Sequence, residues 1–181
     1  RLNIAVKNTM EPDAPGSRIS FQIPRSGRPI KSVAHDTDIG ILKVHASGVG
    51  ARPGILALVS RTLTESGINI KSVVTSQTCI SFLLSRKDLD RGCEAIRGMQ
   101  PRPYRKLVKV TDVALVGIVG AGILRRKGIA AKCFTAVAQQ SVNIEMSSFG
   151  PSEVALYFIV RQKDLRKAVE AIHATFFPAQ P

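Results

Sequence analysis

The sequence consists largely of two copies of one pattern, and this internal repeat limits the possible folds more than any other feature. Five short segments recur in the same order, and the second copy carries two additional residues within 149–153. Residues 39–45 match 113–119 at the start of the repeat, and 94–96 match 170–172 at its end. Self-similarity of this kind indicates one structural unit used twice.

Each copy carries signals for the same order of strands and helices. Residues 39–44 are β-branched and apolar, which is typical of a buried strand. Apolar side chains then recur at helical spacing over 54–66, with Leu58 expected on the buried face. Gly67 follows where the end of a helix favours a left-handed residue. The copy ends with two further strands and a second helix, over 68–74, 79–84 and from Asp88 onward.

The order strand, helix, strand, strand, helix needs one more strand to close a ferredoxin-like sheet. Residues 106–110 follow the first copy and can supply that strand, whereas only a short, proline-broken stretch follows the second copy. Residues 30–34 precede the first copy as 106–110 precede the second. We therefore predict an α+β fold of two ferredoxin-like βαββαβ units with antiparallel sheets, the second unit being completed by an N-terminal strand. The predicted boundaries are 1–29 for a linker, 30–36 for this strand, 37–111 for the first unit and 112–181 for the second.

Charge and hydropathy restrict the classes of partner that the chain can bind. The net charge of +13 suggests nucleic-acid binding, but the basic residues are spread along the chain and no aromatic residues interleave with them. A ferredoxin-like RNA-binding protein, the less favoured alternative, would carry stacking aromatics on its central strands. The corresponding positions here are aliphatic: Ile70, Val73, Ile80 and Leu83. We expect no nucleic-acid partner, and no membrane partner either, because no apolar run approaches the roughly 20 residues that cross a bilayer.

No group of residues supports catalysis by this chain alone. The three cysteines form no C-x-x-C pair, and this favours a reducing, cytoplasmic location over a zinc or redox site. The three histidines, His35, His45 and His173, lie far apart in the sequence. No serine, histidine and aspartate grouping or metal-ligand spacing can be identified. We expect no catalytic residue, no metal and no cofactor in this chain.

Four further motifs are specific enough to compare with known families: the glycine-rich loop 48–55, the Asn-Ile pairs at Asn69 and Asn143, Ser152-Glu-Val154, and the leading segment 8–16. Together they resemble the tandem ACT-domain regulatory region of an aspartate kinase. The resemblance covers nearly the whole chain, and it implies feedback control of lysine, threonine and methionine biosynthesis. It also implies a small amino-acid effector, lysine or threonine, a kinase domain in the same or a partner chain, and a homodimer. The kinase motifs are absent here, so ATP and magnesium are expected only in the missing kinase domain.

The candidate effector site combines a helix start with a strand start. A glycine-rich loop that leads into a helix offers free N–H groups and a favourable dipole to a carboxylate, and Asn69 can offer its amide to the ammonium group. The resemblance adds equivalent residues from the second unit of a neighbouring chain. The candidate effector-binding residues are Gly50, Ala51, Arg52, Pro53, Gly54, Ile55, Asn69, Ile70, Thr75, Ser76, Asn143, Ile144 and Glu145.

Each of these residues also has a purely structural interpretation. On that interpretation the glycines serve only the turn into the helix, Asn69 the cap between helix and strand, and Thr75 and Ser76 an ordinary turn. Lys71 stands where the lysine-sensing relatives carry an acid and would repel a second ammonium group, and Ala51 replaces the acid of threonine-sensing relatives. Neither pocket is therefore reproduced, and this favours threonine or another small neutral effector. Glu145 is the only acid at a matching strand position, which makes the second unit a candidate for the occupied one. The main alternative is an ACT-type regulatory subunit of another amino-acid biosynthetic enzyme, which predicts a single ACT unit followed by an unrelated domain.

Overall fold

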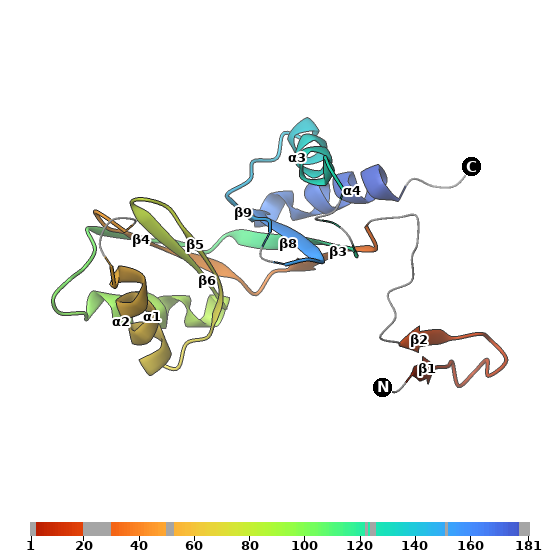
Figure 1. The fold of residues 1–181 in the computed structure, drawn as a ribbon, viewed down its shortest axis with the longest axis horizontal. Coiled ribbons are helices and arrows are strands. Elements are labelled where there is room, and N and C mark those ends of the chain that lie inside the picture. The colour runs from red at the N-terminus through yellow and green to blue at the C-terminus, as the bar shows by residue number, and fades with distance from the viewer. Residues whose placement is uncertain are drawn as a thin grey trace.

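The computed structural model describes residues 3–19, 30–49, 53–121, 123, 126–150 and 152–177. These residues form two four-stranded antiparallel sheets, each covered by a pair of helices, and a separate two-stranded hairpin (Figure 1). The helix pairs of the two units lie on opposite sides of the molecule (Figure 1). No helix in this described part of the chain is both long enough and apolar enough to cross a membrane.

The first unit contains a complete ferredoxin-like sheet. Its strands lie in the order β5-β6-β4-β7, and every neighbouring pair is antiparallel. A short 3-10 turn, η1 (Arg86–Asp88), leads into its second helix. The elements in chain order are β4 (Gly40–His45), α1 (Ile55–Glu65), β5 (Ile70–Thr75), β6 (Cys79–Leu84), α2 (Leu89–Arg97) and β7 (Lys106–Val110).

The second unit takes its fourth strand from the N-terminal side of the first. Strand β3 (Ser32–Asp36) pairs antiparallel with β8, and the sheet order is β3-β8-β10-β9. The remaining elements are β8 (Val113–Val119), α3 (Ile129–Gln139), β9 (Met146–Ser148), β10 (Ala155–Arg161), η3 (Gln162–Asp164) and α4 (Leu165–Phe176). The predicted fold class is confirmed, and the first unit is inserted between β3 and β8 of the second.

Each unit buries its own apolar core between its sheet and its helices. In α1 the buried side chains are Ile55, Val59 and Leu63, one every four residues, which directs a single stripe at the sheet. Leu58, expected on this face, is instead 41% exposed because it lies off that stripe. Phe82 of β6 is the largest buried side chain of the first core, and its repeat counterpart Phe158 of β10 has the same role in the second.

The N-terminal segment contains a hairpin where the sequence suggested only a linker. Strands β1 (Ile4–Val6) and β2 (Ser17–Ile19) pair antiparallel, with Ile4 opposite Ile19. The side chains of Ile4, Val6 and Ile19 are all more than half exposed, and the hairpin lies apart from both units (Figure 1).

Candidate functional site

Both units present an open helix start after their first strand. Gly54 precedes α1 with φ +94°, and Gly128 precedes α3 with φ +83°, a backbone region that favours glycine. A Cβ atom at either glycine would meet nothing within 4 Å, so the backbone angle rather than crowding requires glycine there. No side chain among the described residues caps either helix. The first N–H groups of both helices therefore have no side-chain acceptor in the described part of the chain.

Within the first unit, the start of α1 and the start of β5 lie at opposite ends. Strands β4 and β5 both run antiparallel to β6, so they point in the same direction. Gly54 therefore lies near the end of β5 that carries Thr75, whereas Asn69 lies at the other end. The 11 residues of α1 span about 16 Å between these ends. An amino acid held at Gly54 is thus out of reach of Asn69 in the same unit.

The other predicted residues of the first unit have local roles. Ile55 is part of the core and Pro53 is exposed. The Ser76 hydroxyl accepts a hydrogen bond from the Cys79 N–H at 3.1 Å, as the ordinary-turn interpretation requires. Thr75 ends β5 with its side chain exposed, and Ile70 is half-buried at the start of that strand. Gly50, Ala51 and Arg52 lie outside the described residues.

Charged groups at the two strand starts are paired within the chain. The Lys71 ammonium lies 2.9 Å from Asp36 Oδ2 and donates to the Asp38 carbonyl at 2.6 Å. The repulsion that we expected from Lys71 is therefore offset by these two acidic residues. In the second unit Asn143 is exposed and Ile144 packs against the core. The Glu145 carboxylate accepts a hydrogen bond from Arg161 Nε at 2.6 Å, so it already has a cationic partner.

Asp38 lies at the centre of a polar network that the sequence did not reveal. The Ser85 hydroxyl donates to its carboxylate at 2.7 Å and the Arg86 backbone N–H at 3.1 Å. These hydrogen bonds, that from Ser85 first, and the charge of Lys71 lower the pKa of Asp38 below its ordinary value of 3.8. Asp38 and Ser85 are 47 residues apart in the chain, so no local pattern could have predicted their contact.

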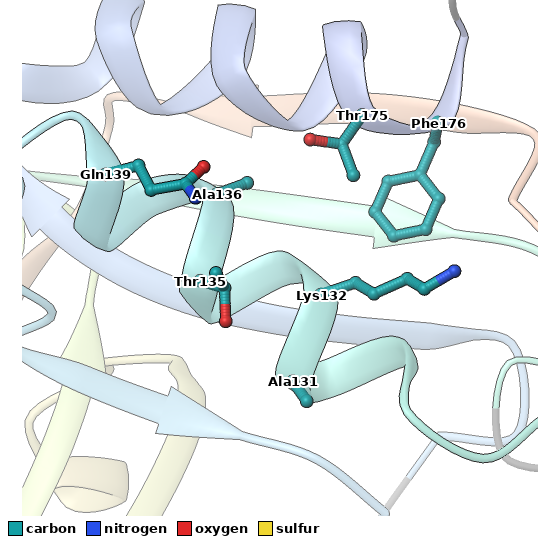
Figure 2. Close-up of a pocket in the computed structure, with 7 residues that line it drawn as sticks. All are labelled: Ala131, Lys132, Thr135, Ala136, Gln139, Thr175 and Phe176. Carbon is teal, nitrogen blue, oxygen red and sulfur yellow. The ribbon is translucent and has the colours of Figure 1, made fainter.

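A shallow groove of about 420 Å³ lies elsewhere, between α3 and α4 of the second unit (Figure 2). Figure 2 shows the Lys132 side chain and the Phe176 ring near one end, and the Gln139 amide near the other. The Thr175 hydroxyl on its wall donates to the Ala171 carbonyl at 2.8 Å and is already satisfied. The groove contains none of the predicted effector-binding residues.

Comparison with known proteins agrees with the two-unit architecture. The family model for the ACT domain matches residues 42–99 and 116–176, once in each unit. The chain therefore belongs to the ACT domain family. Its fold resembles the regulatory subunit of aspartate kinase from Thermus thermophilus, with a TM-score of 0.76 and 28% identity over 82% of this chain and 99% of that subunit.

Full-length enzymes match over a part of their length. The aspartate kinase of Clostridium acetobutylicum has a TM-score of 0.86 and 26% identity over 96% of this chain and 41% of its own. Aspartokinase 3 of Bacillus subtilis is 27% identical over 179 residues, which are 97% of this chain and 39% of that protein. The chain thus spans about two-fifths of these relatives. It corresponds to the tandem ACT regulatory region of aspartate kinases.

Proposed function

We propose that this chain is the amino-acid-sensing regulatory part of an aspartate kinase and acts in feedback control of the biosynthesis of lysine, threonine and methionine. The main support is that two ACT units in tandem match 99% of a separate regulatory subunit of such an enzyme. A regulatory subunit of another enzyme, with one ACT unit and an unrelated domain, is disfavoured by the second match at 116–176. ATP and magnesium belong, in this proposal, to a kinase domain in the same or a partner chain.

The effector site, as we propose it, lies between two copies of the chain. The carboxylate of the effector would accept hydrogen bonds from the N–H groups after Gly54. Its ammonium group would contact an Asn-Ile strand start of the partner copy. Strand β5 is a sheet edge with Val73 36% exposed, and two such edges paired antiparallel would bring opposite ends of two units together. The separation of Gly54 from Asn69 in one unit favours this homodimeric arrangement.

The paired charges favour a small neutral effector. Lys71 and Glu145 each have a partner of opposite charge, so neither strand start carries an acid without a partner that could bind the side-chain ammonium of lysine. We therefore favour threonine over lysine. The three cysteines, Cys79, Cys93 and Cys133, are free thiols, and this supports a reducing, cytoplasmic location.

Calorimetric titration of the 181-residue chain with threonine, lysine and methionine tests the proposal. Gly54→Ala strains the helix start and is expected to weaken binding by at least about tenfold. Gly128→Ala, the matched change in the second unit, identifies which helix start is used. If none of the three amino acids binds the unchanged chain, the proposal fails.

Mixing two variants tests whether the site is shared between copies. Chains with Gly54→Ala and chains with Asn69→Ala each lack one half of every site. In a symmetric dimer the mixed pair regains one intact site, so about a quarter of the original sites should reappear. If Asn143 provides the ammonium contact instead, Asn143→Ala abolishes binding and Asn69→Ala does not. If binding returns neither with the pair Gly54→Ala and Asn69→Ala nor with the pair Gly54→Ala and Asn143→Ala, a site shared between two copies is excluded.

A further inference from the structure

The two units meet through a small apolar cluster built from equivalent positions of the repeat. Ile39 and Leu83 of the first unit pack with Val113 and Ile159 of the second. All four side chains are at most 1% exposed. Ile39 matches Val113 in the repeat, and Leu83 matches Ile159. The intrachain interface is therefore close to two-fold symmetric.

Arg86 makes a polar contact across this interface. Its guanidinium donates to Gln162 Oε1 at 2.7 Å and to the Val113 carbonyl at 3.3 Å, and both acceptors belong to the second unit. Arg86 and Gln162 are themselves equivalent in the repeat. Since the backbone N–H of Arg86 also donates to Asp38, this residue links the connection after β3 to both units.

Lys71 makes a second contact, to the strand that completes the other sheet. Asp36 is the last residue of β3 and pairs with Leu115 of β8, so it belongs to the sheet of the second unit. The Lys71 ammonium is 2.9 Å from Asp36 Oδ2, 2.6 Å from the Asp38 carbonyl and 3.6 Å from Asp38 Oδ2. The ammonium therefore donates one hydrogen bond to the end of β3 and one to the connection to β4.

The residue after Lys71 also contacts the second unit. Ser72 of β5 forms a hydrogen bond with the Tyr157 hydroxyl of β10 in the second unit. The corresponding position to Lys71 in the second unit is Glu145, which instead pairs with Arg161 of its own sheet. An ion pair thus ties the start of β5 across the interface, whereas the ion pair of the equivalent Glu145 stays within its own unit. This start lies directly after Asn69.

We propose that Lys71 and Arg86 form a clasp between the two units, so that a displacement of the start of β5 is passed to β3 and the sheet of the second unit. The clasp would act even without an effector. Its regulatory use rests on the proposed function, because an amino acid bound at Asn69 would displace the strand that Lys71 anchors. The second unit would then respond to a ligand that it does not contact.

Hydrogen exchange on the 181-residue chain without ligand tests the clasp directly. Lys71→Met keeps most of the side-chain length and removes the charge. The amides of β3 that bond to β8 should then exchange at least about threefold faster, because the strand end loses its anchor. Arg166→Ala is the control, since Arg166 forms an exposed ion pair with Glu170 within α4. Unchanged exchange of β3 in Lys71→Met, or an equal increase in the control, overturns the proposal.

A second variant separates the contact from general destabilisation. Asp36→Asn should accelerate β3 exchange, and adding it to Lys71→Met should cause no further acceleration, because the ion pair between Lys71 and Asp36 is already lost in Lys71→Met. Additive effects would contradict the clasp. With threonine present, the unchanged chain should alter its β3 exchange, and Lys71→Met should bind threonine without that alteration. Absence of binding would count against the proposed function, while the ligand-free comparison still decides on the clasp.

Discussion

At the scale of single residues, the repeat allows equivalent positions of the two units to be compared directly. Gly67 after α1 and Ser141 after α3 both have positive φ, +67° and +56°. Their surroundings agree, because Gly67 N–H donates to Thr64 and Ser141 N–H to Ala138, each at 2.9 Å. An L-residue in the left-handed region costs about 1–2 kcal/mol, and glycine does not carry that cost. The second unit therefore ends its first helix with strain that the first unit avoids.

Replacing the strained residue should stabilise the protein. Ser141→Gly is expected to raise the free energy of unfolding by about 0.5–1 kcal/mol, since the relief of strain exceeds the entropy cost of glycine. The reverse change, Gly67→Ser, should lower it by a similar amount, because a Cβ there meets only the Arg91 guanidinium at 3.7 Å and is not crowded. Urea unfolding of both variants measures the two effects. Changes of the same sign would show that φ does not govern these positions.

The lowered pKa of Asp38 makes a prediction about acid stability. A carboxyl group whose folded-state pKa is depressed stabilises the fold above its ordinary value of 3.8, and this stabilisation is lost as the pH falls through the lower folded-state pKa. Asp38→Asn should therefore destabilise the chain more at pH 7 than at pH 3. Urea midpoints at the two pH values test this, with Glu170→Gln, in an exposed ion pair, as the control. A difference that stays constant with pH would contradict the role of Asp38.

At the scale of elements, strand β3 determines whether the second sheet is complete. The Lys31 N–H donates to the Val119 carbonyl at 2.7 Å. The Val119 carbonyl therefore faces β3, and so does the backbone of Gly117 two residues earlier, because these groups alternate in direction along a strand. Ala34 is the register partner of Gly117, so the amide of Ala34 faces β8 and that of His35 faces away. Proline lacks the N–H group, so the two positions should respond differently to it.

Ala34→Pro should destabilise the second unit by about 1–3 kcal/mol, and His35→Pro by less. The native thiols report on each unit separately. Cys133 in the second core is fully buried, and burial raises its pKa to about 11, while Cys93 in the first core is 5% exposed. In Ala34→Pro, thiol labelling in urea should reach Cys133 at a lower urea concentration than in the unchanged chain, with a smaller shift at Cys93. Equal shifts at both cysteines would contradict a local effect.

Much of this element order was predictable because it depends on local pattern. Strand β6 has the predicted limits Cys79–Leu84, and the missing strand of the second sheet followed from the position of 30–36 relative to the repeat. Side-chain direction within a helix was less certain, as exposed Leu58 shows. The separation of Gly54 from Asn69 within one unit was not predicted from the sequence, because it depends on the direction of β5 relative to β4. Contacts such as Arg86 to Gln162 join residues 76 positions apart and leave no local signal.

At the scale of the whole molecule, the chain path makes the two units unequal. The first unit has its four strands in one continuous stretch, from β4 to β7. The second unit is interrupted, because β3 precedes the first unit and β8 follows it. The interface cluster and the clasp residues lie around these connections, where the chain passes between units. The second sheet therefore depends on two chain connections, one before and one after the first unit in the sequence.

Fragments of the chain should reflect this inequality. Residues 37–111 contain all four strands of the first sheet and its buried core, so they should fold alone, although Ile39, Ile41 and Leu83 lose their cover. Residues 112–177 lack the strand that covers one edge of β8 and buries Ile30 against the second core, so they should stay largely unfolded. A peptide of residues 30–36 added in trans should restore dispersed amide signals in the NMR spectrum of 112–177, because strand addition supplies the missing ladder. A scrambled peptide of the same composition is the control. Folding of 112–177 without any peptide, or equal rescue by the scrambled one, would mean that the second unit does not depend on its borrowed strand.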